Sequence, residues 1–169
     1  MPDNIFSRAA QLLAPYVRHP DADQKIQSAR ALVRLALEND HLLLSHRKKM
    51  INDAIWYCTE ADGKWKTRYK SKAVMDLAQN DPTSLVLINH EHVMTRQNLT
   101  LCILTNRDEL LENSVALHKA LDQAVGCIVT AAEHTALLNG DGWARYVNVP
   151  VYDTAMTPPQ IQLHIGGLL

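Results

Sequence analysis

The chain has 169 residues, of which 47% are hydrophobic, and this is enough for one ordinary hydrophobic core. Its 17 basic and 18 acidic residues give a net charge of −1, so the overall charge does not attract the protein to nucleic acid or to an anionic membrane. No apolar run approaches the roughly 20 residues that cross a bilayer, and no signal-peptide pattern or Cys-x-x-Cys pair is present. We therefore expect a single cytoplasmic domain over residues 1–169, with no membrane contact and with free thiols.

The first part of the chain, residues 1–80, has a helical pattern. Apolar side chains recur at helical spacing in residues 5–13, 26–37 and 44–58. Asn39-Asp40 is placed to end the second of these helices and cap the third. A shorter helix is expected over residues 71–79, ended by Asn80-Asp81-Pro82 because proline disfavours a helical conformation in the residue before it. Amphipathic segments joined by short linkers predict an N-terminal helical bundle.

Residues 84–152 mix strand-like and helical patterns. The apolar runs at 84–89 and 127–129 predict strands, and we expect these two runs to pair in a small C-terminal sheet. Residues 93–104 fit a helix or a strand. One long helix is expected over residues 106–125, flanking the sheet, because leucines recur there at helical spacing.

Turn signals divide the remaining residues. Thr130 and Glu133 have the spacing of a capping box, which predicts a short helix to about residue 138. Asn-Gly-Asp-Gly at 139–142 predicts a turn, and residues 143–151 are expected to form an extended or hairpin-like piece. The tail, residues 157–169, has no clear period and is expected to pack on a surface or on a partner. The predicted fold is α-rich α+β, an N-terminal helical bundle with a small C-terminal sheet and flanking helices.

Two histidines and a glutamate follow the first strand-like run. On a strand, His90 and His92 share one face, and Glu91 points to the other. Two imidazoles on one face can begin a site for a divalent metal, with Glu91 and the later His134 as further candidate ligands. Exposure of a polar strand end is the alternative for the pair, and His134 has a purely structural alternative as well. Glu133 is already explained by helix initiation.

A dense basic segment, residues 64–72, carries the positive charge that a phosphate ligand would need. Arg68 and Lys72 lie in it beside Trp65, and Arg96 follows later in the chain. Basic groups next to aromatic rings suit contacts with a nucleic-acid backbone and its bases. A solvated surface is the alternative. No sequence motif of a serine hydrolase, kinase or dinucleotide-binding protein is present.

The blocks Glu91-His92-Val93 and Glu133-His134 resemble the His-Asn-His (HNH) nucleases and small bacterial proteins with similar Glu-His blocks. The resemblance implies that His92 is the general base and that Glu91 and His134 hold one divalent metal. Lys72, Arg68 and Arg96 would then offset charge on the phosphate. The chain departs from the family because a long predicted helix separates His92 from His134 and no motif asparagine is assigned.

A metal-assisted nuclease or other phosphodiester-directed protein is thus the first functional hypothesis. The second is a non-enzymatic protein-binding module, a small inhibitor or adaptor. It would use the basic segment 64–72 or the tail 157–169 to contact a protein partner or a second copy. The lack of a complete catalytic motif and the near-neutral charge favour this second hypothesis.

Overall fold

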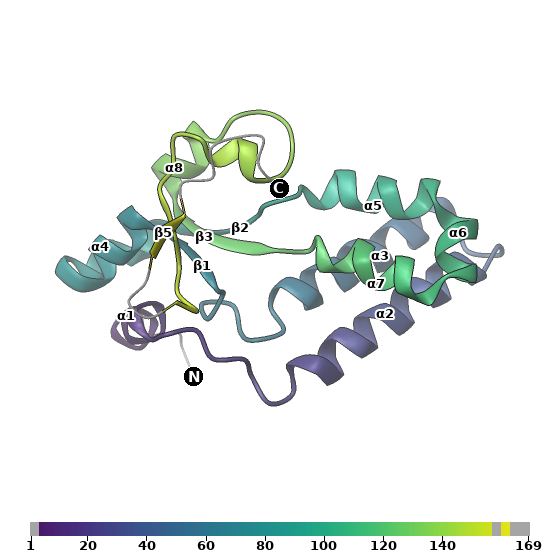
Figure 1. Cartoon of the computed structure of the whole chain (residues 1–169), viewed down its shortest axis with the longest axis horizontal. Helices are drawn as coiled ribbons and strands as arrows, with labels where there is room; N and C mark the ends of the chain where they lie inside the picture. The colour runs from purple at the N-terminus through teal and green to yellow at the C-terminus, as the bar shows by residue number, and fades with distance from the viewer. Residues whose placement is uncertain (1–3, 157–159, 163–169) are drawn as a thin grey trace.

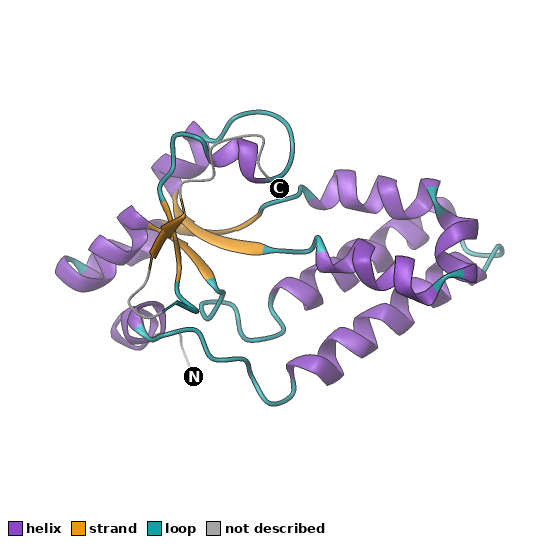
Figure 2. Ribbon diagram, viewed as in Figure 1, coloured by secondary structure: helices purple, strands orange, loops and turns teal. Residues whose placement is uncertain are grey.

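The computed structural model describes residues 4–156 and 160–162, which form a helical bundle beside a mixed sheet (Figures 1 and 2). The bundle contains α2 (Ala22–Glu38), α3 (Leu44–Thr59), α5 (Arg96–Thr105), α6 (Arg107–Glu112) and α7 (Ser114–Asp122). The sheet contains β1 (Tyr69–Ser71), β2 (Ile88–His92), β3 (Gly126–Thr130), β4 (Val151–Asp153) and β5 (Gln160–Gln162). Around the sheet lie α1 (Ile5–Leu13), α4 (Lys72–Asn80), α8 (Ala131–Ala136) and the 3₁₀ turns η1 (Pro82–Leu87) and η2 (Trp143–Tyr146).

The strand order is β2-β3-β1-β4-β5, so β2 lies at an edge of the described sheet. β1 runs parallel to β3, whereas the β2–β3, β1–β4 and β4–β5 pairs are antiparallel. In the register of β2 and β3, His90 lies opposite Ile128 and His92 lies opposite Gly126. This register fixes which side chains of β2 share a face with which side chains of β3.

Each face of the sheet has its own hydrophobic cluster. On one face Ile88 and Ile128 pack with Leu12 of α1 and Val74 of α4. On the other face Cys127, Val129 and Val151 pack with Tyr146 of η2. The alternation of strand side chains therefore separates an α1–α4 face from an α8–η2 face.

The bundle has a separate core. Buried side chains from all five of its helices pack there, including Val33, Ile55, Leu99, Leu110 and Leu121. Burial of these side chains against one another is what holds such short helices in place.

The α-rich α+β class predicted from the sequence is confirmed. β2 pairs with β3 as expected from the two apolar runs, and Ser71 caps α4 by accepting a hydrogen bond from Val74 N at 3.2 Å. The capping box of α8 is present in full, since Thr130 and Glu133 bond each other's backbone N–H. The two caps were predictable because each depends on residues three positions apart, whereas the strand pairing was inferred from two separate apolar runs.

Two expected elements begin or end elsewhere. The strand predicted over 84–89 starts only at Ile88, because Asp81 accepts hydrogen bonds from Thr83 and Ser84 and winds the preceding residues into η1. The helix predicted over 106–125 is two helices, α6 and α7. Asn113 breaks it by accepting hydrogen bonds from Val115 N and Ala116 N, which caps α7.

Other local predictions were also wrong. Asp40 does not cap α3, whose N-cap is Leu43 without a side-chain bond; Asp40 pairs instead with Arg107 at 2.7 Å. Residues 143–146 form η2 rather than an extended segment, and only 151–153 form a strand. The helix α1 packs on α4 and η1 rather than in the bundle.

No helix in the described part of the chain has the length and apolar character needed to cross a membrane. Most of the tail that was predicted to contact a partner, residues 157–169, lies outside the described residues. The part that is described, β5, pairs with β4.

Candidate functional site

Strand β2 separates the four residues predicted to hold a metal into two groups. His90 and His92 point to the face that carries Ile88, and Glu91 points to the opposite face, as the strand alternation predicts. Glu91 meets His134 of α8, where His134 Nδ1 and Glu91 Oε2 are 2.8 Å apart. The structure therefore joins Glu91 to His134 and keeps both apart from the histidine pair.

The histidine pair is packed against Trp56 of α3. The rings of His90 and His92 stack with centroids 5.7 Å apart, and each lies about as close to the Trp56 ring, at 5.3 and 5.1 Å. His92 Nε2 is 3.3 Å from the Thr59 hydroxyl, and His90 Nδ1 is 3.3 Å from the Glu60 carboxylate. Burial lowers the pKa of His90 to about 4 and the pKa of His92 to about 3, so both rings are neutral at physiological pH.

The Glu91–His134 pair has the geometry of an acid–base dyad. Arg145 Nη1 holds the other oxygen of Glu91 at 3.3 Å and also donates to the carbonyl of His92 at 3.0 Å. The Glu91 side chain is only 15% exposed, whereas the His134 side chain is 48% exposed. One nitrogen of His134 is thus held by a fixed carboxylate, and the ring reaches solvent.

A second polar contact lies beside the dyad. Glu133, the residue before His134, accepts hydrogen bonds from the Ser71 hydroxyl at 2.5 Å and from Thr130 N at 2.9 Å. Ser71 is fully buried. The contact ties the start of α8 to the start of α4 and so fixes the helix that carries His134.

A pocket of about 330 Å³ lies along the edge strand, and we call it the β2 pocket. It is lined by Trp56, Lys64, Trp65, Ile88, Asn89, His90, Glu91 and His134. Its wall therefore combines the dyad with two indole rings and an exposed lysine, whose Nζ lies 4.9 Å from the Trp65 ring. Among the predicted metal residues, only His92 does not line this pocket.

The predicted phosphate-binding residues are mostly engaged by acids. Arg68 binds Asp153 through Nε and Nη2, with a closest approach of 2.5 Å, and Lys72 is 2.5 Å from Asp76. Arg96 lies over the Trp56 ring at 5.1 Å. Lys70 is buried, and desolvation lowers its pKa to about 8. Residues 64–72 are thus not a continuous basic surface, and Lys72 does not line the β2 pocket.

The four predicted metal ligands are not all brought to one place, since His90, Glu91 and His134 line the β2 pocket and His92 does not. Within residues 4–156, no three His, Cys, Asp or Glu side chains are arranged to hold one metal ion. His92, predicted to be the general base, is buried and bonded to Thr59, and it lies across the sheet from His134. The reason is the strand period, which sends neighbouring side chains to opposite faces.

Sequence reasoning did not find Arg145 or Trp56, which complete the two groups. Arg145 lies 54 residues from Glu91 in a 3₁₀ turn, and no local pattern links them. Trp56 lies in a helix whose buried side is formed by other residues, and no local pattern links its ring to the two histidines more than 30 residues later. No family model, curated protein or solved structure matches this chain.

Proposed function

We propose that this protein is a hydrolase that cleaves a phosphodiester bond in a nucleotide-containing substrate bound in the β2 pocket. The observation that carries the proposal is the Glu91–His134 contact of 2.8 Å at the wall of that pocket. Carboxylate–histidine pairs of this kind orient an imidazole so that its second nitrogen can accept a proton. The proposal keeps the phosphodiester-directed hypothesis and gives the base role to His134 instead of His92.

The proposed reaction follows from the position of each group. The Nδ1–H of His134 donates to Glu91, which leaves Nε2 free to take a proton from water. The resulting hydroxide forms a new bond to phosphorus, and the bond from phosphorus to the leaving oxygen breaks. The proton on His134 then passes to the leaving oxygen, which restores the neutral imidazole.

Other groups of the pocket would bind the substrate. The Lys64 ammonium is exposed and suits a phosphate oxygen, whose charge grows in the transition state. The partly buried indole of Trp56 would offer apolar contact to a base or sugar, whereas Trp65 is buried in the cluster behind the pocket. Arg145 would act as a positioning residue, because it contacts Glu91 rather than the pocket.

The proposal is tested by assaying bis(p-nitrophenyl) phosphate and short DNA and RNA oligonucleotides with the purified protein. Each assay is run with EDTA and with Mg²⁺, Mn²⁺ or Zn²⁺. Replacing His134 by Ala should lower the rate on the order of 10²-fold or more, since general-base catalysis contributes that much. The control is His118→Ala, which removes an exposed histidine from α7.

Glu91→Gln should lower the rate less than His134→Ala, because the imidazole remains but loses its orienting charge. Far-ultraviolet circular dichroism would verify that each variant is folded. Absence of cleavage under all these conditions, or equal activity of His134→Ala and the wild type, would refute the proposed function.

A peptide-binding module is the second candidate, and the observation that favours it is the edge position of β2. An extended peptide can add to such an edge by main-chain hydrogen bonds and place a side chain in the adjacent pocket. The exposed Val86 and Leu87, at 58% and 63%, lie just before this strand and would add apolar contact. Peptide capture without any phosphodiesterase activity would favour this candidate.

A further inference from the structure

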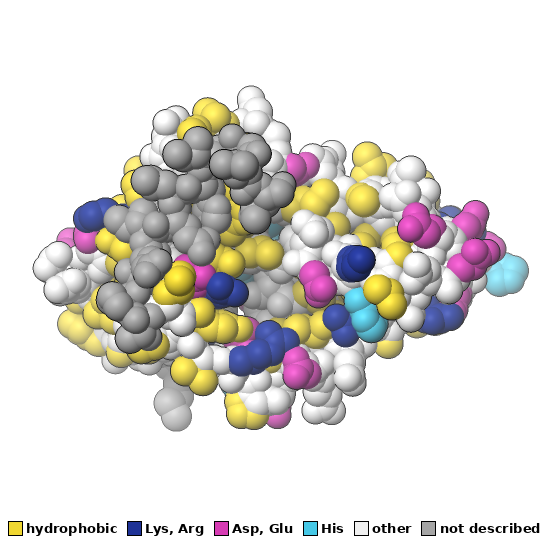
Figure 3. Space-filling view, in the orientation of Figure 1, with side chains coloured by type: hydrophobic (Ala, Val, Ile, Leu, Met, Phe, Trp, Pro, Cys, Tyr) yellow, Lys and Arg dark blue, Asp and Glu magenta, His cyan; other side chains and the backbone are white. Residues whose placement is uncertain are grey.

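A second hollow lies between the sheet and the bundle, away from the β2 pocket. We call it the central cleft; its volume is about 290 Å³, and Figure 3 shows the molecule hollowed between its two parts. It is lined by Tyr16, Arg18, Ile26, Cys58, Thr59, Asp62, Thr67, Arg68, Tyr69, Leu121, Asp122, Ala124, Val125 and Gly126. The cleft is therefore built by α2, α3 and α7 together with β1 and β3 and the segment before α2.

The cleft carries charges of both signs. On the side of the sheet, Arg68 uses Nε and Nη2 for Asp153, and its Nη1 has no bond to an acid among the described residues. On the side of the bundle, Asp122 is 67% exposed, and its recorded ion pair is a loose one with Arg30 at 3.7 Å. One donor nitrogen and one carboxylate thus remain for a ligand.

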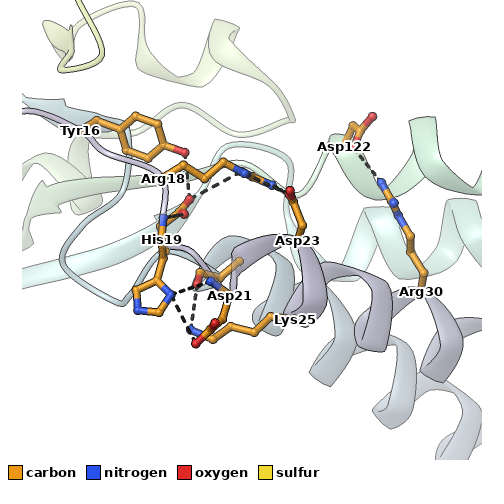
Figure 4. Close-up of polar contacts among 10 residues, drawn as sticks. Tyr16, Arg18, His19, Asp21, Asp23, Lys25, Arg30 and Asp122 are labelled. Atoms are coloured by element: carbon orange, nitrogen blue, oxygen red, sulfur yellow. Dashed lines mark hydrogen bonds and ion pairs between the residues drawn. The ribbon is translucent and has the colours of Figure 1, made fainter.

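The remaining charges of the cleft are already satisfied. Asp62 accepts hydrogen bonds from the Tyr16 hydroxyl at 2.9 Å and from His19 N at 2.7 Å. Arg18 contacts Asp23 at 2.6 Å and lies 3.8 Å from Asp62. Figure 4 shows Tyr16 and Arg18 on one side and Asp122 with Arg30 on the other. Arg18 and Asp62 therefore already have partners within the protein.

The cleft also has an apolar part to its lining, which comes from the bundle and the segment after α7. Ile26 of α2 and Leu121 of α7 face the cleft together with Cys58 and Ala124. Burial raises the pKa of the Cys58 thiol to about 11, so it stays protonated and acts as a small apolar group. The cleft therefore pairs an aliphatic patch with a cation and an anion.

We infer that the central cleft binds a small zwitterion with an aliphatic side chain, of the chemical class of a free α-amino acid. The ligand carboxylate accepts a hydrogen bond from Arg68 Nη1, and the ligand ammonium donates to the Asp122 carboxylate. Its side chain lies on Ile26 and Leu121. The volume of about 290 Å³ is near the lower end of the usual range for ligand sites, which fits a ligand of this size.

This site is separate from the proposed catalytic dyad. The buried pair His90 and His92 lies between the two hollows, since Thr59 of the cleft contacts His92 and Gly126 of the cleft lies against His90. His134 does not line the cleft. Ligand binding in the cleft is therefore expected to survive His134→Gln, and it does not depend on the proposed phosphodiesterase activity.

The experiment measures binding of leucine, valine, alanine, lysine and glutamate to the full chain by isothermal titration calorimetry. Leucine or valine should bind most tightly, and the matched amine and N-acetylated acid, each lacking one charge, should bind on the order of tenfold more weakly. Asp122→Asn should weaken leucine binding by a similar factor. Asp76→Asn is the control, because it removes the same charge from an exposed ion pair outside the cleft.

The inference fails if none of these amino acids binds at concentrations up to about 10 mM, weaker than the usual range for specific ligands. It also fails if the amine or the N-acetylated acid binds as tightly as the amino acid, or if Asp122→Asn binds like the wild type while folded by circular dichroism. Retained binding in His134→Gln supports a site distinct from the dyad, and loss of binding there contradicts it.

Discussion

Adjacent residues of β2 have different chemical environments. Glu91 is held by His134 and Arg145, whereas His92 is buried against Trp56 and Thr59. The period of the strand explains this difference, and it was readable from the sequence because it needs only local spacing. The partners of each side chain were not readable, since they come from elements more than 30 residues away.

Gly126 of β3 has no side chain, and this leaves room for the His90 ring beside it. An ideal Cβ at Gly126 would lie 2.3 Å from His90 Nε2 and 3.2 Å from Thr67 Cγ2. Gly126→Ala should therefore lower the free energy of unfolding by about 1–3 kcal/mol, the usual cost of overpacking a core. Urea unfolding measures the effect. The double variant with His90→Ala should recover part of the loss, and an additive cycle would show that the contact with His90 is not the cause.

The same burial makes stability depend on pH. An unfolded histidine titrates near pH 6.5, whereas burial lowers the pKa of His90 to about 4 and of His92 to about 3. Between these values the unfolded chain binds protons that the folded chain does not. The free energy of unfolding should thus fall as the pH drops from about 6.5 toward 4, by up to about 1.4 kcal/mol per pH unit for each histidine.

The measurement is urea unfolding at several pH values between 7 and about 5, in wild type and in His92→Gln. The variant should lose stability less steeply on acidification, because one buried titrating group is gone. Burial raises the pKa of Glu60, so this group changes the pH dependence of stability in the opposite direction. Its contribution cancels when the slope of the wild type is compared with that of His92→Gln. Equal slopes for wild type and variant would contradict the assignment.

Caps decide where the helices begin. Ser71 and Asn113 each accept backbone hydrogen bonds at the first turn of a helix, α4 and α7. The sequence revealed the capping box at Thr130 and the start of α4, since these signals span three residues. It did not reveal that Asn113 divides one leucine stripe into two helices, because the stripe continues across the break. The three-residue strand β1 lay inside the basic segment, and only pairing with β3 and β4 makes it a strand.

Loss of a cap should cost more where the cap also joins two elements. Ser71→Ala removes the cap of α4 and the hydrogen bond to Glu133, whereas Asn113→Ala removes a cap alone. We expect a loss of about 1 kcal/mol for Asn113→Ala and about 2 kcal/mol for Ser71→Ala, measured by chemical denaturation. A smaller effect of Ser71→Ala than of Asn113→Ala would show that the buried link to Glu133 adds nothing.

The chain passes between the bundle and the sheet repeatedly. It runs from α1 at the sheet to α2 and α3, returns through β1 to β2, enters the bundle again at α5 to α7, and returns at β3 (Figure 1). Neither part is made from one continuous stretch. The sequence suggested an N-terminal bundle followed by a sheet, because order along the chain was the only guide to order in space.

This interleaving should make the bundle and the sheet unfold together. Far-ultraviolet circular dichroism is dominated by the bundle helices, whereas two of the three indoles, Trp65 and Trp143, lie beside the sheet. The two signals should give one midpoint in urea. Leu99→Ala, deep in the bundle core, should cost about 2–5 kcal/mol and shift both signals equally. If the midpoint by circular dichroism moved while the midpoint by tryptophan fluorescence did not, the bundle and the sheet would be independent units. The contact of His90 and His92 with Trp56 of the bundle would then not couple them.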